Sequence, residues 1–294
     1  MMQTLLRGVV RGCLKPVFAL PVSRGFRRSW INGFTSLVIK PQGTQIEALN
    51  MGGVPAERVS NSGANGEAVV LYLHGGAYVL GSPKTHRSIS THLAKAAHAS
   101  VHVLDYRLAP EHPHPAALED ALTAYRWLLD QGIAAARITI AGDSAGGGLA
   151  LATALAIRDT KLPAAGALVL LSPWTDMTNS GASYTANAAI DPMLHHTWAS
   201  ASAADYCGKL PPEHPACSPL FADLRNLPRT LIQVGSDEIL LSDSERLEQK
   251  ARAAGVDVRL HRYDGLWHVF QLHAGMMKAS NEAVAEIAGF IRHG

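Results

Sequence analysis

The sequence predicts an α/β fold with a mostly parallel sheet, and two observations lead to this prediction. Mostly apolar runs recur at 68–73, 101–104, 138–141, 167–171 and 229–234, as expected of strands that are buried on both faces. Sequence of helix length separates each run from the next, and this alternation is typical of βαβ units with right-handed crossovers. We therefore expect a single domain that spans residues 1–294.

Further elements complete this pattern. Short strands at 45–50 and 56–59 flank the Gly52-Gly53 turn, which predicts a hairpin at the start of the sheet. Periodic or Ala- and Leu-rich segments predict helices at 116–129 and 149–157, and a strand at 256–260 and a helix at 279–291 close the chain. Between 171 and 229, about sixty residues form an insertion much longer than an ordinary crossover, and such an excursion usually covers a site.

Composition narrows the class of protein. Hydrophobic residues make up 47% of the chain and charged residues 17%, which suits a large buried sheet. No apolar run is long enough to span a bilayer, so we expect no stable membrane insertion, and we expect no nucleic-acid partner. The three cysteines lack a metal-ligand spacing and an even disulfide framework, which predicts a reducing, cytoplasmic location and no metal site.

The N-terminal segment is basic, although the net charge of the chain is only +2. Its first 46 residues contain seven lysines and arginines and no acidic residue. A transit peptide, an interfacial helix and the solvated face of a cap helix all fit such a segment. We favour the cap helix, because the segment is poor in serine and carries Phe26, Trp30 and Phe34, which can pack on a core.

One stretch carries the signature of a nucleophile. Gly142-x-Ser144-x-Gly146 follows the apolar run at 138–141 and precedes the predicted helix at 149–157. In this strand–turn–helix context the pattern predicts a nucleophile elbow, a turn so tight that its neighbouring residues must lack side chains. The pattern alone is weak in a chain with 26 glycines, but its context identifies Ser144 as the candidate nucleophile.

A serine nucleophile needs a histidine base and a carboxylate that orients the imidazole. Among 14 histidines, His268 fits best, because it follows the last strand at the carboxyl edge of the sheet. The acid is expected after the preceding strand, where Asp237 is our first choice and Glu238 can reach the same space. Asp264 is either a local partner of His268 or a turn residue. Asp143, beside the nucleophile, is interpreted as a structural hydrogen-bonding residue.

Backbone donors for a tetrahedral oxyanion are predicted after the strand at 68–73. Such donors, fixed before the reaction, stabilise the oxyanion by roughly 3 to 4 kcal/mol each. The small residues of His74-Gly75-Gly76-Ala77 leave N–H groups open to a substrate, and Ala145, after the nucleophile, adds another. The order of this turn, the elbow, the acid and the histidine is far more specific than any one part.

Taken together, these motifs resemble the hormone-sensitive-lipase family of carboxylesterases, also called the bacterial family IV esterases. The resemblance extends from about Val69 to the end and is carried by His74-Gly-Gly-Ala-Tyr78, Asp105-Tyr-Arg-Leu-Ala-Pro-Glu-His-Pro, Gly142-Asp-Ser-Ala-Gly-Gly, Leu171-Ser-Pro-Trp-Thr-Asp176, Gly235-Ser-Asp237 and Asp264-Gly-Leu-Trp-His268. It implies an α/β-hydrolase fold with an eight-stranded sheet, no cofactor, and a helical cap formed by about 1–40 and about 180–215.

The resemblance also assigns roles to individual residues. It implies a triad of Ser144, Asp237 and His268, and oxyanion donors at Gly76, Ala77 and Ala145 with Gly75 adjacent. It further implies a preference for short acyl chains, and pairing of two copies through the last strand and the closing helix.

Two positions depart from the family pattern. Ala77 replaces a third glycine, and Val269 replaces the glycine that follows the catalytic histidine. The backbone N–H of an alanine still serves as a donor, but both side chains narrow the space for bulky alcohols. The candidate pocket residues, each of which can equally be plain core, are Tyr78, Met193, Trp198, Trp267 and Val269.

Two other functions stay open. An amidase or peptidase can use the same triad, although nothing in the sequence resembles the extra propeller of an oligopeptidase. A non-catalytic ligand receptor is disfavoured by His268, because the plant gibberellin receptors, which resemble this family, have lost that histidine. We therefore predict a serine carboxylesterase that acts on a small-molecule ester through an acyl-enzyme.

Overall fold

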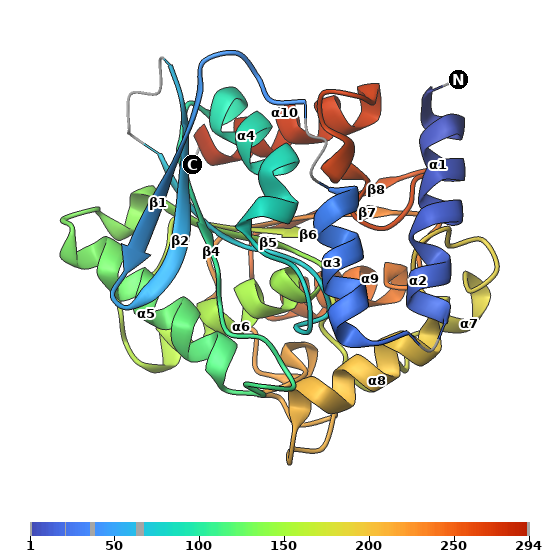
Figure 1. The fold of residues 1–294 in the computed structure, drawn as a ribbon. Coiled ribbons are helices and arrows are strands. Elements are labelled where there is room, and N and C mark those ends of the chain that lie inside the picture. Colours follow the sequence, from blue (N-terminus) through green and yellow to red (C-terminus); the bar gives the residue numbers. More distant parts are fainter. Residues whose placement is uncertain (1, 21, 36–38, 63–67, 293–294) are drawn as a thin grey trace.

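A computed structural model of the chain contains an eight-stranded sheet with helices on both faces (Figure 1). It describes residues 2–20, 22–35, 39–62 and 68–292. The strands are β1 (Thr44–Met51), β2 (Val54–Asn61), β3 (Val69–Leu73), β4 (Ser100–Leu104), β5 (Ile138–Asp143), β6 (Ala167–Leu171), β7 (Thr230–Gly235) and β8 (Val258–Tyr263). The predicted eight-stranded α/β architecture is confirmed.

The α-helices are α1 (Met2–Cys13), α2 (Lys15–Ala19), α3 (Arg24–Phe34), α4 (Arg87–Ala97), α5 (Ala116–Asp130), α6 (Ala145–Asp159), α7 (Ser183–Ala186), α8 (His196–Cys207), α9 (Leu241–Ala253) and α10 (Lys278–Arg292). Short 3₁₀-helices are η1 (Pro83–His86), η2 (Ala135–Arg137), η3 (Pro219–Phe221) and η4 (Phe270–His273).

The strand order explains where a ligand site forms. The order is β1-β2-β4-β3-β5-β6-β7-β8. Strand β2 is antiparallel to both of its neighbours, and the six strands β3 to β8 run parallel to one another. From β3 the chain moves to β4 on one side, and from β5 it moves to β6 on the other. The carboxyl ends of β3 and β5 therefore flank a topological switch point, where open α/β sheets bind their ligands.

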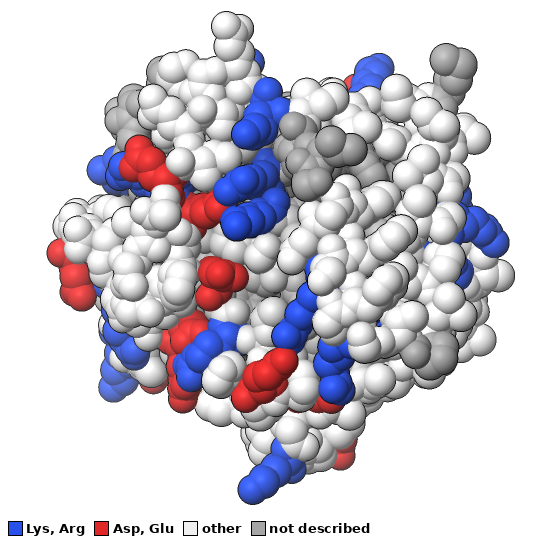
Figure 2. Space-filling model, in the orientation of Figure 1, with Lys and Arg blue, Asp and Glu red and all other residues white. Residues whose placement is uncertain are grey.

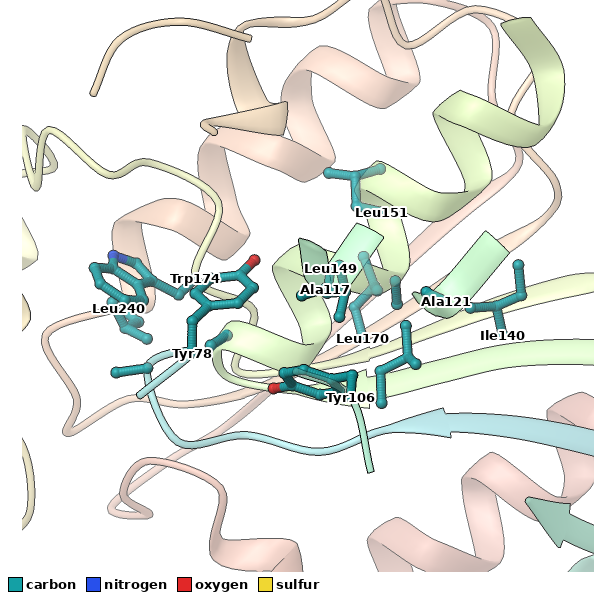
Figure 3. Close-up of a cluster of buried hydrophobic side chains, with 14 of the residues drawn as sticks. Tyr78, Tyr106, Ala117, Ala121, Ile140, Leu149, Leu151, Leu170, Trp174 and Leu240 are labelled. Atoms are coloured by element: carbon teal, nitrogen blue, oxygen red, sulfur yellow. The ribbon is translucent and has the colours of Figure 1, made fainter. Parts of the chain in front are cut away.

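Different helices cover the two faces of the sheet. Strand β3 alternates between them, because successive side chains of a strand point to opposite faces. Val70 and Tyr72 belong to the core under α4 and α10, whereas Leu71 and Leu73 belong to the core under α5 and α6. Figure 3 shows part of this second core, where Leu149 of α6 lies near Ala117 of α5 and Leu170 of β6. Such two-sided burial explains the uninterrupted apolar runs of the central strands.

Among the boundaries that differ from the sequence predictions, two have clear local reasons. The helix expected at 149–157 begins at Ala145, because the elbow leads directly into α6. The last strand begins at Val258 rather than at 256, because the N–H of Val256 still bonds to the carbonyl oxygen of Ala251 in the turn that ends α9 (3.0 Å).

The N-terminal helices lie together with α8 on the same side of the molecule (Figure 1). Phe18 of α2 stacks on Trp198 of α8 with ring centroids 4.3 Å apart. Several bases of this segment bind groups elsewhere in the chain, among them Arg24 with Asp205 (2.7 Å) and Arg28 with Glu111 (2.8 Å). The surface over α1 and α3 is mostly uncharged (Figure 2). Within the described ranges, the helices are too short or too polar to cross a membrane.

Candidate active site

The elbow after β5 holds Ser144 in a backbone conformation that side chains rarely adopt. Its φ and ψ are 55° and −123°. A Cβ on Gly146 would lie 2.0 Å from the carbonyl oxygen of Leu73, and one on Gly142 would lie 2.2 Å from that of Gly146. The N–H of Ser144 bonds to the carbonyl oxygen of Leu171 at 2.8 Å. Both glycines are thus required by contact, and the turn is anchored to the end of β6.

His268 lies in the loop after β8 and is fully buried beside a carboxylate. Its Nδ1 is 2.6 Å from Oε2 of Glu238. Burial disfavours the charged ring, but the carboxylate of Glu238, with smaller contributions from Asp191 and Asp143, outweighs burial and raises the pKa of His268 above its usual value. This hydrogen bond fixes the proton on Nδ1 and leaves Nε2 as an acceptor.

The expectation that Asp237 orients His268 is corrected by this geometry. The carboxylate of Asp237 points away and accepts a hydrogen bond from Nη1 of Arg7 (2.7 Å) and one from the Ser236 hydroxyl (2.7 Å). Asp237 and Glu238 are consecutive residues in the turn after β7, so their side chains leave the backbone in different directions. Asp264 makes no hydrogen bond to the histidine either: its side chain is 84% exposed and lies 3.4 Å from Nε of Arg262, whereas His268 is buried.

Ser172 is a residue of the site that the sequence analysis missed. Its hydroxyl donates to Oε1 of Glu238 (2.7 Å) and accepts from the N–H of Val269 (3.2 Å), so it joins the loop of the carboxylate to the loop of the histidine. The N–H of Gly235 donates to the same Oε1 at 2.8 Å. One signal was available, since Ser172 directly follows the buried run at 167–171 at the ligand-binding edge of the sheet.

The turn after β3 supplies fewer free donors than its small residues suggested. The N–H of Gly75 points to Oδ1 of Asp143 (3.1 Å) and to Nε2 of His86 (3.2 Å), so this glycine is corrected from a possible oxyanion donor to an anchor of the turn. No hydrogen bond within the described residues uses the N–H of Gly76 or Ala77. Ala145 is the first residue of α6, so its N–H has no acceptor within the helix.

Asp143, the last residue of β5, links the turn after β3 to the elbow. Its buried carboxylate accepts from the Tyr72 hydroxyl (2.8 Å) and from Gly75, and lies 3.3 Å from Nε2 of His86. Burial would raise the pKa of Asp143, but His86 and Tyr72 stabilise its charged form and lower it. The side chain therefore stays ionised, and its hydrogen bonds hold it against Tyr72, Gly75 and His86.

A cavity of about 230 Å³ opens in front of Ser144 and His268. Four of the five expected pocket residues line it, namely Met193, Trp198, Trp267 and Val269. Tyr78 is not among the lining residues, because it is buried in the core, where it stacks on Tyr206 with ring centroids 3.6 Å apart. The N-terminal helices contribute further apolar wall, including Leu6, Val10, Leu14, Phe18 and Ile31.

The backbone explains why the family has glycine at the two positions where this chain departs from its pattern. Ala77 and Val269 both adopt left-handed conformations, with φ of 54° and 48°. Glycine enters this region without steric cost, whereas a β-branched residue is an outlier there.

In the described parts of the chain, histidine, cysteine and acidic side chains form no group of three or more able to hold a metal ion.

Comparison with known proteins agrees with this geometry. The family of the alpha/beta hydrolase fold matches residues 70–272. An acetyl-hydrolase of Streptomyces hygroscopicus is 42% identical over 84% of this chain and 82% of that enzyme, and an esterase of Acinetobacter venetianus is 39% identical over 84% and 81%. A crystal structure of an esterase from the bacterial hormone-sensitive lipase family superposes with a TM-score of 0.95, at 42% identity, over 99% of this chain and 97% of that one. The chain therefore belongs to the hormone-sensitive-lipase family of carboxylic ester hydrolases, on the α/β-hydrolase fold.

Proposed function

We propose that the protein hydrolyses short-chain acyl esters through an acyl-enzyme, with Ser144 as nucleophile, His268 as base and Glu238 as the orienting acid. The observation that carries the proposal is the 2.6 Å contact between Nδ1 of His268 and Glu238, in a cavity that Ser144 also lines. The imidazole accepts the serine proton at Nε2 while Oγ attacks the ester carbonyl carbon. The same proton leaves with the alcohol, and a water molecule then repeats the attack to release the acid.

The oxyanion of each tetrahedral intermediate would be held by the N–H groups of Gly76, Ala77 and Ala145. The N–H groups of Gly76 and Ala77 make no hydrogen bond within the described residues, and that of Ala145 lies at the start of α6, whereas Gly75 is excluded because its N–H is already bonded. Donors set before the reaction need no reorganisation when the negative charge develops.

The size and chemistry of the cavity support short acyl chains. Its volume, about 230 Å³, lies below the 300 to 1,000 Å³ that is usual for drug-sized ligands. The walls are mainly apolar, which suits an alkyl chain rather than a charged acyl group. Val269, which has a side chain where the family has glycine, also lines this cavity and takes up space within it.

We further infer that residues 1–40 and 180–215 act as a cap. Helices α1, α2 and α3 and the start of α8 supply apolar wall to the cavity, and the aromatic stack of Phe18 on Trp198 joins the two segments. A cap of this kind keeps bulk water from the reacting carbonyl.

The decisive experiment is a rate series with p-nitrophenyl esters of increasing acyl length and one anilide. We expect the highest kcat/KM for acyl chains of about two to six carbons and little turnover of the anilide. Faster hydrolysis of the anilide would favour the amidase, and faster cleavage of a long-chain triglyceride emulsion would contradict the preference for short chains.

Pairing of two copies is proposed through the last strand and the closing helix. Strand β8 stands at the end of the strand order, and α10 packs on the sheet nearby. Sedimentation at micromolar concentration tests this proposal, and a monomer alone would rule it out.

A further inference from the structure

Helix α1 contributes wall to the cavity although it lies outside the sheet. Leu6 and Val10 are buried, and both line the cavity together with Val9 and Leu14. The helix contains no acidic residue, and Leu5, one turn before Val9, is exposed to solvent (60% exposed). The position of α1 against the cavity therefore depends on few polar contacts.

Three of those contacts come from the guanidinium of Arg7. Nη1 of Arg7 donates to Oδ2 of Asp237 at 2.7 Å and to the carbonyl oxygen of Gly265 at 3.3 Å, and Nη2 donates to the carbonyl oxygen of Ile190 at 2.9 Å. Nε2 of Gln3, one turn earlier, donates to the same Gly265 oxygen at 3.1 Å. The planar fork of an arginine suits such a junction, because it presents several donors in fixed directions.

The partners of Arg7 belong to the two loops that hold the proposed acid and base and to the insertion over the site. Asp237 precedes Glu238 directly, and Gly265 lies in the loop that leads to His268. Ile190 belongs to the insertion over the site, whose neighbour Asp191 accepts the N–H of Ile239 at 2.9 Å. One side chain thus joins α1 to the loop of the acid, the loop of the base and the insertion.

We propose that Arg7 is a positioning residue that couples the docking of α1 to the loops of Glu238 and His268. The acyl group is then bound in a closed cavity only while this junction is made. The inference deepens the proposed esterase function and rests on it. Removing the junction frees α1, so the cavity loses a wall and long acyl chains lose more contacts than short ones.

The test compares Arg7→Met with Arg11→Met, an exposed base of the same helix. We expect Arg7→Met to raise KM for p-nitrophenyl hexanoate about fivefold or more, to change KM for the acetate less, and to leave kcat within about threefold. Arg11→Met should match the wild type. Asp237→Asn should reproduce the effect of Arg7→Met, and the double variant should be no worse than either single variant, because both changes break one junction.

Amide hydrogen exchange supplies a readout that does not depend on turnover. Residues 2–13 should exchange at least about tenfold faster in Arg7→Met than in Arg11→Met, with the sheet unchanged. If the wild type hydrolysed no ester, the proposed function would fail while this measurement still tested the junction. Unchanged exchange in α1, or additive effects of Arg7→Met and Asp237→Asn on KM, would overturn the proposal. If Arg7→Met did not fold, the Asp237→Asn comparison alone would decide.

Discussion

The nucleophile elbow and helix α1 face the same cavity, but different forces hold them in place. The elbow is fixed by its own backbone, because Gly142 and Gly146 leave no room for a side chain and Ser144 bonds to the end of β6. Helix α1 is held by the burial of Leu6 and Val10 and by side-chain hydrogen bonds. Backbone sterics therefore set the position of the proposed nucleophile, whereas a few side-chain contacts set the position of the cavity wall that is proposed to select the substrate.

The largest effect is expected at the elbow and its base. Ser144→Ala and His268→Ala should each lower kcat by about 10⁵-fold or more while the protein stays folded, because the members of such a triad act as a unit. Single-turnover rates with a p-nitrophenyl ester and circular dichroism measure both points. Substantial turnover in either variant would refute the mechanism.

The two consecutive acids after β7 provide the second test. Glu238→Gln should lower kcat by about 10³- to 10⁴-fold, because the imidazole loses its orienting partner, whereas Asp237→Asn should change it by no more than about threefold. Steady-state kinetics of the two variants with the same acetate ester give the comparison. If the order were reversed, the acid would be Asp237, and the contact between His268 and Glu238 would be structural.

Deleting part of the N-terminal segment tests the role of helix α1, the second region of the comparison. Removal of residues up to Trp30 should lower kcat/KM for soluble esters by about 10- to 100-fold and flatten the preference for acyl length, because water enters the cavity while the sheet survives. Full activity combined with lost binding to anionic vesicles would instead identify a membrane segment.

The smallest effect is expected in the pH profile. The base must be neutral, and the pKa of His268 is raised, so kcat/KM should fall on the acid side with a midpoint above the usual 6.5. In Glu238→Gln, burial is no longer opposed by that carboxylate, so the residual activity should persist to lower pH. A midpoint that stayed unchanged in this variant would show that another group controls the profile.

The sequence predicted what backbone sterics and strand burial determine. The parallel sheet, the elbow at Ser144 and the loop position of His268 all follow from local patterns of apolar residues and glycines. The choice between Asp237 and Glu238 did not follow, because it depends on which way two adjacent side chains turn. The partner that accompanies this choice, Arg7, is 230 residues away in sequence.

Other parts of the site were hidden for the same reason. Gly75 looks like a free donor in the sequence, but its N–H is taken by Asp143, which lies 68 residues further along the chain. Ser172 appeared in the sequence only as part of a motif. The role of its hydroxyl is recognised only when the fold brings Glu238 and Val269 within hydrogen-bonding distance of it. Long-range polar contacts between loops leave no periodic trace in a sequence.

Ala77 and Val269 hold backbone conformations that favour glycine, with a side chain attached. In the genetic code, every alanine codon and every valine codon becomes a glycine codon by changing its second base. A single nucleotide change therefore restores glycine at either position and relieves backbone strain there, and at Val269 it also removes a side chain from the wall of the cavity. One nucleotide substitution is therefore enough to give a larger site, and accepting bulkier alcohols would need no change of fold.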